Sequence, residues 1–478
     1  MAEADLKQKT AKTLKWNTID KFATQLLYAV TGVVLANILS KEDFGLVGIM
    51  LAFQAFASLF VDSGFSAALI QKESPTDRDY STVFYFNLGV SVFIYAILWI
   101  CAPLIADYYH DERLTSLSRV MFLAFIINAT ALVQTNRLMK QMTVAKIAVS
   151  NSVGLIVSGI VSIILAVKGF GAWAIVWQTI TLAVVKSAFL WLTTHWFPQT
   201  GFSLSSLKSV FSVGMGVMAS SFLNTISLNI YSFVIGKACN LSALGCYTQA
   251  DKWSKMGVTS NSQILTNSFL PILSGFQGDK ERFVRAARKM NRFSSYLTFP
   301  SMLLLIALAE PIFHILFGTK WDEAIILFQI LAARGIFVVL TSLYNQYILA
   351  LGKSKALVWY EIIKDVMMIV AIVVTVPFGV ETIVWGQFAA SAVFYTFALP
   401  FTSHHTGYPM WRLVGDALPY AAVAIGAAVA ALSIGNWVEN AWLKLIAVLV
   451  AFVPIYIIII QLLGSKVQQE ILEYLRRK

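Results

Sequence analysis

The chain has 478 residues and a net charge of +11, and it is 58% hydrophobic but only 13% charged. Soluble domains carry roughly 25% charged residues, so this composition excludes an ordinary soluble protein. Apolar stretches of roughly 20 residues recur along the chain, and each is long enough to cross a hydrocarbon core of about 30 Å as a helix. We therefore predict an all-α integral membrane protein without a soluble domain.

The first element is a basic segment, residues 1–15, followed directly by a long apolar stretch. Asp20 and Lys21 stand where a signal peptide would have its short apolar core, so we expect the first span to be retained. Breaks at glycine, proline and charge clusters predict fourteen spans. They lie at about 14–39, 44–69, 81–105, 114–136, 144–167, 172–195, 208–238, 243–273, 291–316, 322–350, 355–376, 381–402, 412–433 and 441–463.

The loops between these spans carry an asymmetric distribution of positive charge. Most loop cations lie on the side of the two termini, whereas the opposite loops hold only Lys41, Arg113, Arg119, Lys168, Lys237 and Lys320. By the positive-inside rule, both termini are expected in the cytoplasm. This dispersed charge favours topology over nucleic-acid binding as its explanation. One basic stretch, DKERFVRAARKMNRF at 279–293, is expected either in the lipid headgroup layer or as a linker.

An internal repeat relates the two halves of the chain. A shift of 200 residues aligns LANILSKEDFGLVGI, which begins at Leu35, with IGKACNLSALGCYTQ, which begins at Ile235, so that Gly45 falls on Gly245. Six predicted spans separate the copies, so the halves would share one orientation in the membrane. We predict an N-lobe of six helices at 1–200, a C-lobe of six helices at 201–405, and a C-terminal helix pair with a cytoplasmic tail at 406–478.

Polar residues recur at helical spacing inside several spans. In chain order they are Asn17, Asp20, Lys21, Thr24, Tyr28 and Thr31; Gln54, Ser58 and Asp62; Ser220, Asn224, Ser227 and Tyr231; and Thr248, Asp251, Lys252, Lys255, Thr259, Ser262 and Thr266. Asp251 and Lys255 also form an i, i+4 pair of favourable order. A charge at mid-membrane costs about 2.5–3.5 kcal/mol, so these residues are expected to face a hydrated interior or to be paired.

Further charges interrupt other spans: Lys186, Arg334, Glu361, Lys364 and Asp365. Two explanations remain open for those on the tenth and eleventh spans. Glu361 with Lys364, or Arg334 with a carboxylate, would tie helices together; alternatively, these groups serve transport. For the first and eighth spans we favour a role in transport.

Motifs for catalysis or metal binding are not found in the sequence. Cys101, Cys239 and Cys246 lack metal-ligand spacing and are interpreted as packing residues. The adjacent His404 and His405 would point about 100° apart on a helix, so we expect no metal site. There is no phosphate-binding Gly-Lys loop, Gly-x-Ser-x-Gly elbow or His-Glu-x-x-His pair. We therefore expect no cofactor and no enzymatic activity.

Four stretches together resemble a known family: LKWNTIDKFATQLL, ILSKEDFGLVGI, DSGFSAALIQKESPTDRDYSTVFYFNL and LGCYTQADKW. They are similar to the polysaccharide transporter (Wzx-type) branch of the multidrug/oligosaccharidyl-lipid/polysaccharide flippase superfamily, over nearly the whole chain and most densely at 12–90. The resemblance implies two six-helix lobes, a central cavity and two further helices. It also implies a bacterial inner-membrane carrier of undecaprenyl-pyrophosphate oligosaccharides for O-antigen, capsule or exopolysaccharide. Polysaccharide polymerase and other export proteins would be its partners.

The predicted substrate site combines the resemblance with the polar stripes. Asp20 and Asn37 replace the Glu and Arg that family members often carry, so we assign the pyrophosphate to Lys21, Lys252 and Lys255. The expected sugar contacts are Asn17, Tyr28, Asn224, Tyr231, Tyr247 and Gln249. Candidate carriers of a coupled proton or sodium ion are Asp20, Asp251, Glu361 and Asp365. Coupling is not required, because outward movement of negative charge from a negative cytoplasm is favourable by about 2.3 kcal/mol per charge per 100 mV.

Three alternatives remain open at this point. A drug or cation antiporter of the same superfamily would need an anionic cavity for its cationic substrates. Lys21, Lys252 and Lys255 add positive charge and so disfavour this class of transporter. A lipid II flippase would have the same fold and similar substrate chemistry. A membrane glycosyltransferase or polymerase needs a catalytic loop outside the membrane, yet the longest outer loop, ADYYHDER at 106–113, is short and offers no nucleophile or metal set.

Overall fold

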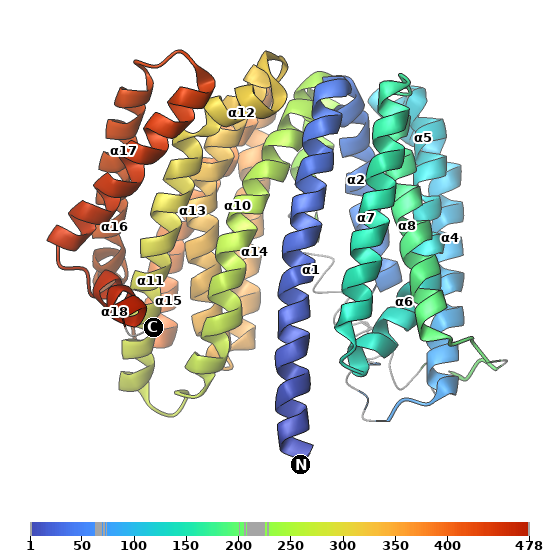
Figure 1. The fold of residues 1–478 in the computed structure, drawn as a ribbon, viewed down its shortest axis with the longest axis horizontal. Coiled ribbons are helices and arrows are strands. Elements are labelled where there is room, and N and C mark those ends of the chain that lie inside the picture. Colours follow the sequence, from blue (N-terminus) through green and yellow to red (C-terminus); the bar gives the residue numbers. More distant parts are fainter. Residues whose placement is uncertain are drawn as a thin grey trace. The chain divides into compact units, whose positions relative to one another are not determined.

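A computed structural model describes residues 2–62, 69, 72, 74–199, 201–204, 207, 225–226 and 229–476. The described residues form helices and no strands, which confirms the predicted all-α fold class (Figure 1). The chain forms two compact units, an N-terminal unit of Met1–Gly245 and a C-terminal unit of Cys246–Lys478. The lobe boundaries predicted from the sequence stay predictions.

Seven described helices belong wholly to the N-terminal unit: α1 (Ala2–Ile38), α2 (Lys41–Asp62), α4 (Asp77–Tyr109), α5 (Arg113–Met121), α6 (Leu123–Lys140), α7 (Val144–Val167) and α8 (Trp173–Thr194). Within this unit α1 packs on α7, α7 on α8, and α6 on both α8 and α4 (Figure 1). The start of α4 shows how the sequence sets a helix boundary. Thr76 and Asp79 form a reciprocal capping box, which satisfies backbone donors that the first turn leaves unpaired.

Helix α10 (Leu241–Ser274) begins in the N-terminal unit and continues into the C-terminal unit. The other described helices of the C-terminal unit are α11 (Lys280–Ala307), α12 (Ala309–Phe317), η1 (Thr319–Trp321), α13 (Asp322–Ala350), α14 (Ser354–Thr375), η2 (Val376–Phe378), α15 (Val380–Thr406), α16 (Met410–Gly435), α17 (Ala441–Leu462) and α18 (Lys466–Arg476).

Among the described residues, 10 helical segments are long and apolar enough to cross a membrane. The pair α11 and α12, bent by 55°, makes up to 11. Helices α10 and α14, with 34 and 22 residues, are also long enough to span but fall outside this set. They are the helices that carry Asp251, Lys252 and Lys255, and Glu361, Lys364 and Asp365. The count of fourteen spans stays a prediction.

The 200-residue repeat recurs in the structure at one turn. Helix α1 ends at Ile38 and α2 begins at Lys41, while the helical stretch 229–238 is followed by α10 from Leu241. Each second helix has a polar cap at the matching position. Ser40 Oγ accepts from the Asp43 amide at 3.1 Å, and Asn240 Oδ1 accepts from the Ala243 amide at 2.8 Å. The same local chemistry therefore starts both helices.

The first turns of α2 and α10 cross with their backbones in contact. A Cβ added at Gly45 would lie 2.1 Å from the Leu241 carbonyl oxygen, and one added at Gly245 would lie 2.0 Å from the Lys41 carbonyl oxygen. The two contacts are reciprocal and are related by the same 200-residue shift. Small residues are what allow helices to approach this closely, so the aligned glycines of the repeat have a common steric cause.

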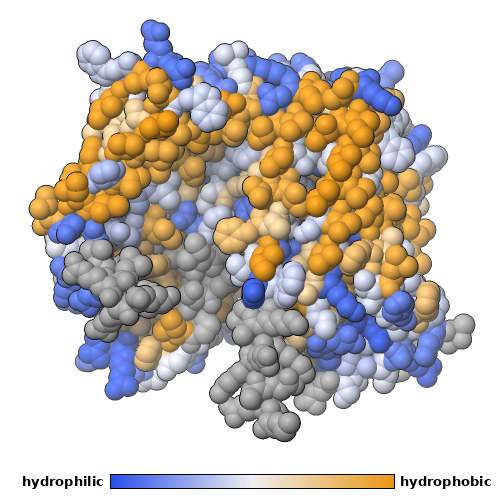
Figure 2. Space-filling view, in the orientation of Figure 1, coloured by the Kyte–Doolittle hydropathy of each residue, from blue (hydrophilic) through white to orange (hydrophobic). Residues whose placement is uncertain are grey.

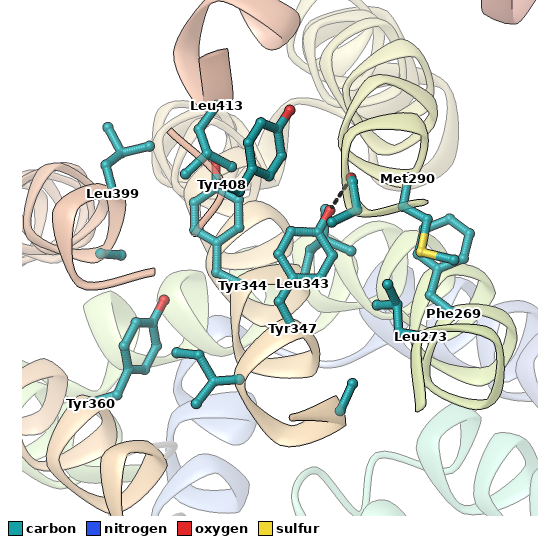
Figure 3. Close-up of a cluster of buried hydrophobic side chains, with 14 of the residues drawn as sticks. Phe269, Leu273, Met290, Leu343, Tyr344, Tyr347, Tyr360, Leu399, Tyr408 and Leu413 are labelled. Carbon is teal, nitrogen blue, oxygen red and sulfur yellow. Dashed lines mark hydrogen bonds between the residues drawn. The ribbon is translucent and has the colours of Figure 1, made fainter. Parts of the chain in front are cut away.

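The core of the C-terminal unit is a cluster of large apolar and aromatic side chains from α10, α11, α13, α14, α15 and α16 (Figure 3). Tyr347 on α13 is fully buried, and its hydroxyl donates to the Ala287 carbonyl of α11 at 2.9 Å. Tyr360 on α14 donates in the same way to the Thr341 carbonyl of α13 at 3.2 Å. Because a buried hydroxyl without a partner is costly, these bonds fix how the helices of the core are oriented.

Helix α16 packs on α11 through a face rich in alanine, and α17 packs on α16 and α12. The outward faces of α16 and α17 are hydrophobic, as Figure 2 shows at the side of the molecule where they lie, and expose Leu418, Ile425, Val429, Leu443, Ile446 and Val450. An exposed apolar surface on membrane-length helices is suited to contact with lipid chains.

The basic stretch at 279–293 is helical, with one exposed and one buried face. It forms the first turns of α11, where the Asp279 side chain caps the helix by accepting from the Arg282 amide at 3.0 Å. Phe283, Ala287 and Met290 are buried in the core of the C-terminal unit. The apolar face therefore packs against protein, whereas Arg282, Arg285 and Lys289 are exposed. Placement of this stretch in the headgroup layer or as a linker stays a prediction.

An ionic cluster joins α11 to α16. Asp416 accepts from Arg288 Nε at 2.7 Å, from Arg292 Nη2 at 2.6 Å and from the Tyr408 hydroxyl at 2.7 Å. The Asp416 side chain is 5% exposed, whereas those of Arg288 and Arg292 are 40% and 28% exposed. Burial, and secondly the neighbouring carboxylate, raises the pKa of Tyr408 well above its usual range, so the phenol stays protonated and donates.

Removal of this carboxylate is expected to destabilise the C-terminal unit. Breaking a buried ion pair typically costs 3–5 kcal/mol, and we expect Asp416→Ala to cost about 3 kcal/mol because both arginines reach solvent. Thermal unfolding of the purified protein in detergent measures the effect. Tyr408→Phe, which removes one hydrogen bond, should cost about 1 kcal/mol. An Asp416→Ala variant as stable as the parent would show that the cluster contributes nothing to stability.

Candidate substrate and ion site

Helix α10 carries the charges of the predicted site. At 1.5 Å per residue, Lys252 lies about 17 Å along the helix from Leu241, roughly half the thickness of a hydrocarbon core. Lys255 Nζ is paired with Asp251 Oδ2 at 2.6 Å. Lys252 Nζ lies 5.4 Å from the centre of the Trp253 ring. Because these three are the only charged residues of α10, the helix has one cation in excess over its ion pair.

Two predicted sugar contacts on the same helix are buried. Tyr247 is 3% exposed, and its hydroxyl accepts from Gln387 Nε2 on α15 at 3.1 Å. Gln249 is 2% exposed, and its side-chain oxygen accepts from Trp253 Nε1 at 3.2 Å. In this conformation Tyr247 ties α10 to α15 and Gln249 holds Trp253. A substrate would reach them only after these helices move.

The charges of α13 and α14 make two further sets of polar contacts within the C-terminal unit. Glu361 is paired with Lys364 on the same helix and accepts from the Asn345 side chain of α13. Arg334 on α13 donates from Nε to Ser391 Oγ on α15 at 3.2 Å. Asp365 is half-buried on α14. The arrangement links α13, α14 and α15 through polar contacts, as expected for charges inside a membrane.

The polar stripe of α1 divides between two faces of the helix. Asp20 faces α7, where its carboxylate accepts from Asn151 Nδ2 at 3.2 Å and from the Thr24 hydroxyl at 3.3 Å. Asn17, Lys21 and Tyr28 are exposed. The spacing of four and seven residues between these three places them on one face of the helix. The exposed face is therefore accessible to a ligand, whereas Asp20 contributes to packing between α1 and α7.

The remaining predicted residues are spread over other elements. Lys186 is half-buried on α8, Tyr231 is buried, and Asp62 is the last residue of α2. Asn224 lies outside the described residues. Among the predicted site residues that the structure describes, ion pairs form between Asp251 and Lys255 and between Glu361 and Lys364. Their roles in binding substrate or ions stay predictions.

Four polar residues missed in the sequence contact the predicted charges or sugar contacts: Asn151, Asn345, Gln387 and Ser391. Each lies inside a long apolar helix, and each supplies the partner that an intramembrane polar group requires. A single amide or hydroxyl in an apolar span is a weak signal in a sequence. It becomes informative only when the packing of the helices shows which group it faces.

The membrane-length helices, the charges within them and the repeat together define a multi-pass membrane transporter. A family model described as polysaccharide biosynthesis protein matches residues 34–326, which is more than half of the chain. The chain belongs to this family. The succinoglycan biosynthesis transport protein ExoT of Rhizobium meliloti (strain 1021) is 25% identical over 473 residues, covering 98% of this chain and 96% of that protein.

Solved structures show a shared fold. A structure of the lipid II flippase MurJ in an inward closed conformation superposes with a TM-score of 0.75 at 14% identity, covering 94% of this chain and 99% of that one. An inward-facing multidrug resistance MATE family transporter of the MOP superfamily gives 0.63 at 17% identity, covering 80% and 96%. Together with ExoT, these proteins are transporters or flippases and not enzymes, which confirms the prediction that this chain is not an enzyme.

Proposed function

We propose that this chain is a flippase that moves an undecaprenyl-pyrophosphate-linked oligosaccharide from the cytoplasmic to the outer leaflet of the bacterial inner membrane. The product would supply O-antigen, capsule or exopolysaccharide synthesis, with polysaccharide polymerase and other export proteins as partners. Family membership and the similarity to ExoT support the substrate class. The observation that carries the proposal is the cation Lys252 beside the Asp251–Lys255 pair, well inside the long helix α10.

The physical need for such a protein comes from the headgroup. Sugar hydroxyls and a pyrophosphate lose their hydrogen bonds in hydrocarbon, so the headgroup does not cross unaided. Lys252, Lys255 and Lys21 would hold the pyrophosphate, and the exposed Asn17 and Tyr28 would contact sugar, while the isoprenoid tail stays in lipid. Transport would proceed by alternating access with both termini in the cytoplasm, as the distribution of loop cations predicts.

The proposal is tested in the source bacterium by deleting the gene. The cells should continue to make the lipid-linked oligosaccharide but retain it on the cytoplasmic leaflet, where a glycosidase added to inverted membrane vesicles reaches it. Complementation with the intact chain should return the oligosaccharide to the outer leaflet. Loss of the lipid-linked oligosaccharide itself, rather than its retention, would point to a role in synthesis and contradict the proposal.

The membrane potential is expected to drive transfer without a coupled ion. An inside-negative potential favours outward movement of a negative charge by about 2.3 kcal/mol per charge per 100 mV. Two of the candidate carriers, Asp251 and Glu361, are also already engaged with lysines. In proteoliposomes without a proton or sodium gradient, an inside-negative potassium potential set with valinomycin should therefore accelerate outward transfer. A transfer rate that is independent of the membrane potential but requires a sodium or proton gradient would show that a coupled ion is carried by Asp20, Asp251, Glu361 or Asp365.

A further inference from the structure

A surface groove of about 820 Å³ lies at one end of α14 and α15, apart from the predicted substrate residues. We call it the α14–α15 groove, and its lining consists of Gly352, Lys353, Lys355, Ala356, Trp359, Phe401 and His405. Its aromatic part comes from both helices. The ring of His405 packs edge-on against Phe401 with centroids 4.6 Å apart, and Trp359 is 63% exposed.

Two cations lie beside these aromatic side chains. Lys353 and Lys355 are exposed, and Lys353 Nζ donates to the His405 carbonyl at 2.7 Å. That contact holds the Lys353 ammonium at the end of α15, and an ammonium has further N–H groups to offer to an anion. In the ion pairs of the described residues, neither lysine has a carboxylate partner. The groove therefore combines positive charge with an aromatic wall.

The groove continues into a hydrophobic stripe along α14. Trp359, Val366, Val370 and Val373 are spaced by seven, four and three residues and are all more than half exposed. This spacing puts them on one face of the helix, which is long enough to span the bilayer. A hydrocarbon chain seated at Trp359 can therefore follow the helix, while a charged headgroup stays at the lysines. Free phosphate would use only the lysines and leave the stripe without an occupant.

We propose that the α14–α15 groove binds an anionic phospholipid, with its phosphate at Lys353 and Lys355 and an acyl chain along Trp359 and the α14 stripe. The lysines lie in the loop predicted to be cytoplasmic, and the cytoplasmic leaflet is where anionic lipids attract basic segments. The lipid bound in this groove is not the transported substrate. Its binding does not depend on the proposed transport function.

The test uses the purified full chain in bilayers that contain lipids with brominated chains, which quench tryptophan on contact. The Trp359 signal is the difference between the protein and its Trp359→Phe variant, since the chain has 13 tryptophans. Increasing fractions of brominated phosphatidylglycerol in phosphatidylcholine, and the reverse, give the relative affinity at Trp359. Each lysine near a membrane surface favours anionic lipid, so we expect phosphatidylglycerol to bind about tenfold more tightly.

Charge variants decide whether the lysines cause this preference. Lys355→Gln should reduce it, and Lys353→Gln with Lys355→Gln should abolish it. Arg412→Gln is a matched control, because Arg412 lies 4.7 Å from the Trp411 ring at the start of α16 and outside the groove. Inorganic phosphate at constant ionic strength should have no effect. Equal quenching by both lipids, a preference that survives the double substitution, or displacement by inorganic phosphate would each overturn the proposal.

Discussion

Substitution of Lys252 and Lys255 together by alanine is expected to abolish transfer of the lipid-linked oligosaccharide without preventing insertion. The two lysines and Asp251 give α10 a net charge of +1, and their removal leaves Asp251 and a net charge of −1. A helix that attracted pyrophosphate would then repel it. Loss of a desolvated charge partner costs binding 2–5 kcal/mol, so transfer by reconstituted protein should fall by about thirtyfold or more.

The single variants separate the roles of the two lysines. Lys252→Ala removes the cation in excess and should reduce transfer more than Lys255→Ala, whose cation is already paired with Asp251. Lys444→Ala is the control, because Lys444 lies on α17 and pairs with Glu310 at 2.8 Å. Its transfer rate should match that of the parent. Normal transfer by the double variant, inserted in normal amount, would remove these lysines from the anion site.

Alanine at either glycine of the α2–α10 crossing is expected to destabilise the protein strongly. At Gly45 and at Gly245 the added carbon would meet a backbone carbonyl oxygen, at 2.1 and 2.0 Å. A backbone atom moves only if the whole helix moves, so the cost should be at or above the upper end of the 1–3 kcal/mol typical of overpacking, about 3 kcal/mol. Thermal unfolding in detergent measures it.

Gly89 provides the matched control for this prediction. It lies inside α4 with nothing within 4 Å of the added carbon, so Gly89→Ala meets no obstacle. Because alanine is the better helix former, that variant should be as stable as the parent or slightly more stable. Equal stability of Gly45→Ala and Gly89→Ala would show that α2 and α10 do not cross in backbone contact.

Much of the fold follows from the sequence because a lipid environment leaves few alternatives. A segment that crosses lipid must pair its own backbone N–H and C=O groups, and a helix does this. The length and apolar content of a segment therefore predict where such helices occur. The aligned glycines of the repeat are likewise recognisable, since Gly45 and Gly245 have the same steric role. The ninth span was predicted to begin at about 291, whereas α11 begins at Lys280, because the arginines of its first turns are typical of a loop between spans. The spacing of Phe283, Ala287 and Met290 indicates the amphipathic helix that the structure shows.

The partners of the intramembrane charges were much harder to predict. The Glu361–Lys364 pair lies within one turn of a helix, so sequence spacing was sufficient to suggest it. Asp20 and Asn151 are 131 residues apart, and only the packing of α1 on α7 brings them together. A carboxylate partner for Arg334 was one of two alternatives left open, and the structure shows that Arg334 Nε donates to the Ser391 hydroxyl. Long-range partners depend on how the helices rotate and tilt, which one sequence does not specify.

Substrate choice by the purified protein tests the proposed function most directly. Proteoliposomes would contain labelled undecaprenyl-pyrophosphate oligosaccharide, labelled lipid II or a cationic dye, each followed by a reagent confined to the opposite side of the bilayer. We predict transfer of the oligosaccharide lipid, slower transfer of lipid II and no transport of the dye. Transport of the dye or of lipid II without transfer of the oligosaccharide lipid would contradict the account.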